Sequence, residues 1–217
     1  MTRIGITGGI GSGKTYVCRL LQRRGIPVYH CDDEAKRLMV ESPVIRQQLT
    51  QLIGDDIYIN NELNKPRIAS YLFGEVTHSI NDAHLALSTH VAQVNAIVHP
   101  VVRQDFLRWA EQQESSVVAQ ECALLFESGF QDTVDVTIEV YAPHDLRLQR
   151  AIQRDQATAE QIQARMAQQM DEDEKRSRAD YVILNDGTDL DTQIDQLLTQ
   201  IEKCPNKIEN SKLSNCK

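Results

Sequence analysis

The chain has 217 residues, of which 41% are hydrophobic, and it carries a formal net charge of −8 at pH 7. This length accommodates one α/β core with insertions, or one large and one small domain. The negative charge argues against a nucleic-acid-binding surface. No segment approaches the roughly eighteen uninterrupted apolar residues of a membrane span. We therefore expect the partners to be small phosphorylated molecules, held by local basic clusters.

The sequence reaches its first expected strand within three residues, without the order of charged, apolar and small residues that marks a signal peptide. Five cysteines are present, namely Cys18, Cys31, Cys122, Cys204 and Cys216, and they contain no C-x-x-C pair. Two of them fall in expected core elements. We therefore expect buried or idle thiols in a reducing cytoplasm, not disulfides or a zinc site.

Residues 8–15 read GGIGSGKT and fit the phosphate-loop pattern G-x-x-x-x-G-K-[ST]. They follow residues 3–7, a short apolar stretch that is typical of a strand. They lead into residues 16–21, whose apolar positions have helical spacing. This strand–loop–helix context distinguishes a phosphate site from a glycine-rich turn that binds nothing. The sequence therefore predicts a nucleoside-triphosphate site.

Each residue type in this loop has a physical role. Gly8, Gly11 and Gly13 allow positive φ and bring backbone N–H groups close to phosphate oxygens. The helix that begins near Lys14 directs its partial positive charge at the same anion, and Lys14 adds a full charge at the β and γ phosphates. The Thr15 hydroxyl can ligate Mg²⁺. The expected nucleotide-binding residues are Gly8, Gly9, Gly11, Ser12, Gly13, Lys14, Thr15 and Tyr16.

Helical patterns separate five apolar, β-rich stretches, at residues 4–7, 27–29, 117–121, 134–141 and 181–184. This alternation predicts an α/β protein with a five-stranded parallel sheet and helices on both of its faces. Together with the loop, it indicates the P-loop NTPase fold. Ligands of such sheets bind at the carboxyl ends of the strands, so we expect the functional residues to follow the strands.

Two carboxylates follow expected strands. Asp32 could accept a hydrogen bond from an acceptor hydroxyl and orient or deprotonate it. Alternatively, Asp32 or Asp33 is only the N-cap of the next helix. Glu121 ends the third strand and could hold a metal ion through water, or it could be a plain strand-end carboxylate. His99 precedes Pro100 between helix breakers, which favours a local hydrogen bond in a turn over a chemical role.

Two long segments interrupt the strand order. Residues 33–113 read as several helices, and we interpret them as an acceptor-binding insertion whose turns lie at residues 42–43, 54–55, 60–61 and 99–100. Residues 144–179 form a second insertion. The nucleotide-binding core would then comprise residues 1–32, 114–143 and 180–203, and the polar residues 204–217 would form a mobile tail.

The second insertion is rich in basic side chains, at Arg147, Arg150, Arg154, Arg165, Lys175, Arg176 and Arg178. Thr158 with Gln161 three residues later marks a helix start, so the segment reads as two helices around a turn. The first three arginines are spaced to share one helix face. Such a face suits a lid that closes over a triphosphate, although a solvated basic face beside the acidic residues 171–174 has the same spacing.

The loop alone shows only that a nucleotide binds, because many protein classes use it. A GTPase switch is disfavoured, because Asn64-Lys65 continues as Pro66-Arg67, residues 206–209 read NKIE, and no D-x-x-G occurs. The loop also lacks the proline of adenylate-kinase-type loops. A kinase for another small molecule fits better, since it needs fixed cations around the transferred phosphoryl group.

With these residues in place, residues 3–201 resemble the dephospho-coenzyme A kinase family. The loop is close to the family's TGGIGSGK. The family's Asp-x-Asp falls on residues 30–32, where His30 replaces the first aspartate and Asp32 keeps the second. Further ordered matches lie at residues 63–65, 95–100, 121–127 and 179–185. Arg150 and Arg154 fall on the lid arginines, and Arg165 and Gln169 on the R-I-x-x-Q element.

The resemblance implies ATP-dependent phosphorylation of the ribose 3′-hydroxyl of dephospho-CoA, with Mg²⁺. We expect a cytoplasmic protein that is a monomer or a small homo-oligomer. Its catalytic residues would be Asp32, Lys14, Arg150 and Arg154, and its substrate would contact Asp32, Lys65, His99 and Glu121. Two alternatives stay open: a phosphate-loop kinase for another small alcohol, and a nucleotide-gated binding protein without phosphotransfer.

Overall fold

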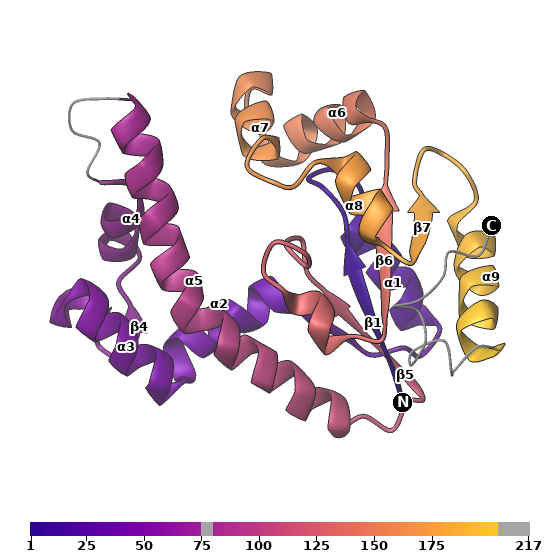
Figure 1. Ribbon diagram of the computed structural model, residues 1–217, viewed down its shortest axis with the longest axis horizontal. Helices are drawn as coiled ribbons and strands as arrows, with labels where there is room; N and C mark the ends of the chain where they lie inside the picture. Colours follow the sequence, from indigo (N-terminus) through magenta and orange to yellow (C-terminus); the bar gives the residue numbers. More distant parts are fainter. Residues whose placement is uncertain (75–79, 204–217) are drawn as a thin grey trace. The chain divides into compact units, whose positions relative to one another are not determined.

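The computed structural model describes residues 1–74 and 80–203 (Figure 1). Residues 204–217, for which the sequence predicts a mobile tail, lie outside the described residues. Contacts divide the chain into two compact units. Unit 1 comprises Met1–His30 with Trp109–Lys217, and unit 2 comprises Cys31–Arg108.

Unit 1 is built on the five-stranded parallel sheet that the sequence predicts, in the order β2-β5-β1-β6-β7. The strands are β1 (Thr2–Thr7), β2 (Val28–His30), β5 (Val117–Glu121), β6 (Val136–Tyr141) and β7 (Tyr181–Leu184). The fourth predicted stretch, residues 134–141, becomes a strand only from Val136 onward. The 3₁₀ helix η2 (Phe130–Thr133) precedes it, and the Val134 N–H still donates to the Gln131 carbonyl.

The helices of unit 1 are α1 (Lys14–Arg23), α6 (His144–Asp155), α7 (Ala159–Met166), α8 (Glu172–Arg178) and α9 (Leu190–Lys203). Ile4 and Ile6 of β1 join a buried core with α1 and α9. Gly5 faces the opposite way, and a Cβ there would lie 2.9 Å from Leu125. Helices α1 and α9 thus cover one face of the sheet, and the segment after β5 covers the other (Figure 1).

The side chain of Gln193 bonds to the backbone of Leu184, the last residue of the edge strand β7. Leu184 N–H donates to the Gln193 side-chain oxygen at 2.9 Å, and the Gln193 amide donates back to the Leu184 carbonyl at 3.0 Å. Gln193 lies on α9, so this helix provides at that point the hydrogen bonds that a further strand would otherwise provide.

The predicted two-helix arrangement of residues 144–179 is wrong, because the segment contains three helices. The capping box of Thr158 and Gln161 does start α7 as expected. The third helix, α8, begins in the acidic run: the Asp171 side chain accepts from the N–H groups of Asp173 and Glu174. Carboxylates near a helix N-terminus are stabilised there, so this run is a helix start.

Unit 2 is mainly helical. It contains α2 (Cys31–Glu41), α3 (Pro43–Ile53), the 3₁₀ helix η1 (Asp55–Ile57), a hairpin of β3 (Tyr58–Ile59) and β4 (Glu62–Leu63), α4 (Lys65–Phe73) and most of α5 (Ile80–Glu111). The hairpin turns at Asn60 and Asn61, whose φ values of 52° and 66° suit a type I′ turn. The predicted turn is therefore correct, and the sequence analysis missed only the two short strands around it.

The predicted turn at His99 and Pro100 is wrong, because α5 continues through both residues. Val98 and Val102 lie on either side of this point and are buried, whereas Pro100 itself is exposed. An internal proline costs a helix about 3 kcal/mol, so tertiary packing of the buried stripe overrides the local signal here.

Candidate active site

The loop between β1 and α1 has the conformation that the sequence predicts. Gly8, Gly11 and Gly13 have φ values of 144°, 79° and 94°. A Cβ at Gly8 would lie 2.3 Å from the carbonyl oxygen of Val140, and one at Gly11 would lie 2.2 Å from that of Arg147. Strand β6 and helix α6 approach the loop so closely that there is no room for a side chain at Gly8 or Gly11.

The side chain of Lys14 lies over this loop. Its Nζ donates to the carbonyl oxygens of Gly8 at 2.7 Å and of Gly9 at 3.3 Å. An anion at the N-terminus of α1 would therefore meet a fixed ammonium group together with the positive end of the helix. Ser12 is fully buried within the loop, and the Tyr16 side chain, in the first turn of α1, is half exposed.

A second group of side chains lies at the carboxyl ends of β2 and β5, beside the first turn of α1. The Thr15 hydroxyl donates to Glu121 Oε1 at 3.1 Å. The other oxygen of Glu121 makes a very short contact with His30 Nδ1. His30 and Glu121 are register partners in neighbouring parallel strands, which explains why they meet. The structure thus gives a position to His30, for which the sequence analysis had no role.

Thr15 and Glu121 together suit a hard cation. A hydroxyl and a carboxylate beside a phosphate site are the donors that Mg²⁺ takes from proteins, with substrate phosphates and water completing its shell. Among residues 1–74 and 80–203, no group of three or more His, Cys, Asp or Glu side chains could hold a metal ion. A magnesium ion bound mainly through phosphate needs no such group.

The arginines of α6 lie in different environments, although the sequence predicts a shared face. Arg150 Nη1 donates to the Asn185 carbonyl at 3.1 Å, and the Asn185 side chain donates to the Ser12 carbonyl at 2.7 Å. Arg154 is exposed and donates to Asp155 at 2.6 and 3.1 Å. Arg150 is therefore connected to the loop through Asn185.

Asp155 is shared between two arginines. Besides Arg154, its carboxylate accepts from Arg165 Nη1 at 2.7 Å. These two guanidinium groups lower the pKa of Asp155 to about 2. The carboxylate therefore stays ionised at any physiological pH.

A cluster of ionisable side chains, three of them buried, adjoins the loop at Gly9, and the sequence analysis did not predict it. Its members are Glu127, Glu139, Arg147, Glu172 and Lys175. Arg147 Nη1 is 3.1 Å from Glu172 Oε2. Lys175 Nζ is 3.3 Å from Glu127 Oε1 and 3.8 Å from Glu172 Oε1. The only sequence signal was a glutamate inside an apolar strand, because β6 reads VTIEVY.

Glu139 is the most unusual member of this cluster. It is 0% exposed, and its burial together with the negative charge of Glu172 raises its pKa to about 7. Among the described residues, no donor bonds to either oxygen of an ionised Glu139. As a neutral acid, Glu139 can donate its proton to Glu172. We therefore assign it the protonated form below neutral pH.

The other predicted site residues belong to unit 2. Asp32 is exposed in the first turn of α2, which begins at Cys31, so it is not the N-cap of that helix. Lys65 is exposed at the start of α4. His99 is half-buried in α5, and its burial and the nearby Arg103 lower its pKa.

No helix in the described part of the chain has both the length and the apolar character needed to cross a membrane.

Comparison with known proteins identifies close relatives. A family model described as dephospho-CoA kinase matches residues 2–191. A dephospho-CoA kinase from Bacteroides fragilis is 46% identical over 186 residues, which cover 85% of each chain. A crystal structure of a Thermus thermophilus protein aligns with a TM-score of 0.75 at 30% identity, over 92% of this chain and 97% of that one. A structure of dephospho-CoA kinase from Campylobacter jejuni aligns with a TM-score of 0.62 at 22% identity, over 93% and 97%.

Replacing Glu139 with Gln is expected to remove a pH-dependent part of the free energy of unfolding. The pKa of Glu139 rises from 4.5 to about 7 on folding, so the native state holds the extra proton between these pH values. The stability of the wild type relative to Glu139→Gln should therefore fall as pH rises through this window, by a total on the order of 3 kcal/mol. Thermal unfolding of both proteins at a series of pH values measures this difference.

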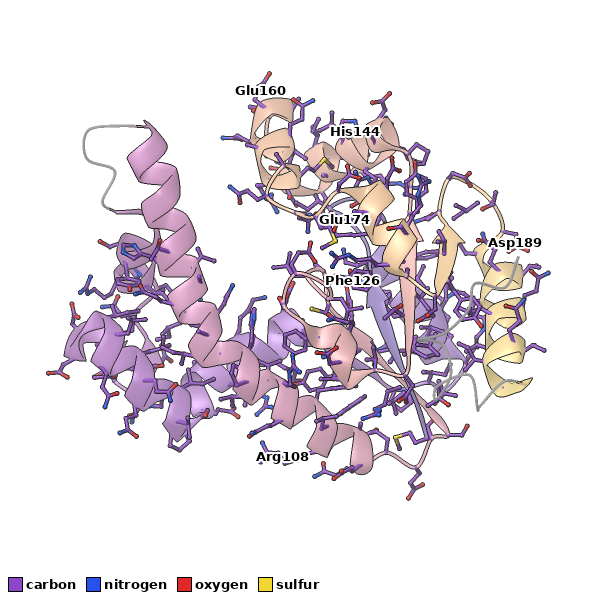
Figure 2. All side chains as sticks on the ribbon, in the orientation of Figure 1. Arg108, Phe126, His144, Glu160, Glu174 and Asp189 are labelled. Carbon is purple, nitrogen blue, oxygen red and sulfur yellow. The ribbon has the colours of Figure 1, made fainter. Side chains whose placement is uncertain are left out.

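The matched control is Glu174→Gln, which alters an exposed carboxylate on α8 (Figure 2). It should show no comparable trend. A constant difference between wild type and Glu139→Gln across the window would contradict the assignment of a neutral Glu139.

Proposed function

The chain belongs to the dephospho-CoA kinase family, and from this we propose that it transfers the γ-phosphoryl group of ATP to the ribose 3′-hydroxyl of dephospho-CoA. This reaction gives coenzyme A and ADP and is the final step of coenzyme A synthesis. The observation that carries the proposal is the phosphate loop, with Lys14 bonded over Gly8 and Gly9. The buried free thiols of Cys18 and Cys122 support a reducing, cytoplasmic setting.

The loop and the residues beside it would hold the nucleotide. Lys14 and the start of α1 bind the β and γ phosphates, and Lys14 exchanges its bonds to the loop carbonyls for bonds to phosphate oxygens. The Thr15 hydroxyl would hold Mg²⁺, and Glu121 would reach it through water. When bound, Mg²⁺ neutralises charge on the phosphates.

We assign the acceptor side of the reaction to residues of the helical insertion, 33–113, and to Asp32 just before it. The Asp32 carboxylate accepts the proton of the 3′-hydroxyl, which raises the nucleophilicity of that oxygen at the moment of attack. Lys65 and His99 would contact the substrate. Both assignments rest on the resemblance of residues 63–65 and 95–100 to motifs of the family.

The helices of residues 144–179 would act as a lid. Arg150 and Arg154 donate to the transferring phosphoryl group and spread its developing charge, and closure excludes water from the transfer. Arg154 must first release Asp155, to which it donates two hydrogen bonds. Its exposed position on α6 allows that release.

The proposed reaction is tested by coupled measurement of ADP release with ATP, Mg²⁺ and dephospho-CoA. We expect turnover that depends on the acceptor and saturates with it. A panel of nucleosides and sugar acids serves as the control for acceptor identity. ADP release no faster than the acceptor-free background would contradict the proposal, and faster turnover with another alcohol would identify a different substrate.

Asp32→Asn is expected to lower kcat by roughly 10²–10⁴-fold while ATP binding stays nearly unchanged, because the amide cannot accept the hydroxyl proton. Steady-state kinetics and ATP titration separate the two effects. The adjacent Asp33→Asn is the matched control, since Asp33 bonds to Lys36 at 2.9 Å on the same helical turn. If Asp32→Asn kept near-normal turnover, the acid–base role would have to pass to another group.

Arg154→Lys is expected to lower kcat/KM at least tenfold, about 1.4 kcal/mol, because an ammonium group cannot make the bidentate contact of a guanidinium with phosphate. The control is Arg108→Lys on α5 (Figure 2), an exposed arginine that pairs with Asp105. Equal kinetics for the two variants would show that Arg154 is a surface charge.

A further inference from the structure

The phosphate loop rests on a buried ion pair that the proposed mechanism does not use. Arg147 is 6% exposed, and its Nη1 lies 3.1 Å from Glu172 Oε2. A Cβ added at Gly9 would be 1.9 Å from Arg147 Nη1 and 2.4 Å from Glu172 Oε1. The paired charges therefore lie directly against the backbone of the loop at Gly9.

The same arginine contacts the loop a second time through its main chain. A Cβ at Gly11 would lie 2.2 Å from the Arg147 carbonyl oxygen. Between these two contacts, the Ile10 N–H donates to the side-chain oxygen of Gln169 at 3.0 Å. Three successive positions of the loop are thus held by groups from α6 and from the segment that leads to α8.

A contribution to the stability of the fold is a poor explanation for the ion pair of Arg147 and Glu172. Removing two charges from water costs several kcal/mol per ion, which only excellent hydrogen-bond geometry offsets. Here Arg147 Nε, Glu172 Oε2 and Lys175 Nζ have no aligned hydrogen-bond partner among the described residues. Replacing a buried ion pair with apolar residues of similar volume is often neutral or stabilising.

We propose that Arg147 is a positioning residue for the phosphate loop, held against Gly9 by Glu172 so that the loop keeps its ATP-binding shape. This inference rests on the proposed binding of ATP. A planar guanidinium can lie flat along the backbone at Gly9 while pairing with Glu172 at its edge, which a compact ammonium group cannot do. Lys175, between Glu172 and Glu127, holds Glu172 in place from the other side.

Arg147→Met tests the proposal, because it keeps a side chain of similar length and removes the charge. We expect the Kd for ATP with Mg²⁺ to rise about tenfold or more, while the KM for dephospho-CoA changes less than about twofold. Arg147→Lys should restore part of the ATP affinity. Titration calorimetry and steady-state kinetics measure both, well below the unfolding temperature of each variant.

The double variant Arg147→Met with Glu172→Met separates positioning from a structural role. It removes both charges of the pair, and Lys175 keeps its ion pair with Glu127 at 3.3 Å, so the Tm should recover toward that of the wild type. Its Kd for ATP should stay raised. A Kd that returns to the wild-type value together with the Tm would overturn the proposal, and so would an unchanged Kd in both Arg147→Met and the double variant.

The matched control is Arg178→Met. Arg178 pairs with Glu174 at 2.7 Å on α8, but both side chains are about half exposed, and Glu174 is labelled in Figure 2. This variant should bind ATP like the wild type. Failure of the wild type itself to bind ATP would refute the proposed function, whereas normal wild-type binding with unaffected Arg147 variants refutes only the positioning role.

Discussion

The close approach of three distant segments to the backbone of the phosphate loop is the constraint on which the rest of unit 1 depends. The carbonyl oxygens of Val140 and Arg147 and the side-chain amide of Asn185 occupy the space that side chains at Gly8, Gly11 and Gly13 would need. Strand β6, helix α6 and the turn after β7 therefore help to define the shape of the loop. The site is thus a tertiary structure, although its motif is local in sequence.

Electrostatics in unit 1 is organised in layers. Lys14 and the N-terminus of α1 lie at the loop that we propose binds phosphate, and acidic side chains lie beside this loop. One of them is Glu139, whose pKa is raised to about 7 by burial and by the charge of Glu172, so below neutral pH it adds no negative charge to this region. A chain with a net charge of −8 can therefore offer a locally positive site for a triphosphate.

The sequence predicts features that depend on local pattern and misses those that depend on register or packing. The loop, the five strands and the helix start at Thr158 each follow from residues close together in the chain. The contact of His30 with Glu121 needs the pairing of β2 with β5, which no spacing reveals. The passage of α5 through Pro100 likewise depends on the buried stripe around it, which outweighs a strong local signal.

The Gln193 side chain has a consequence for how this molecule meets others. β7 is an edge strand, and Val182 and Leu184 on it are exposed hydrophobic residues. Such an edge is a template on which a foreign strand can extend the sheet. Since Gln193 already bonds to both backbone groups of Leu184, an incoming strand would have to displace it first. One glutamine on a neighbouring helix thereby blocks the last residue of this edge to an incoming strand.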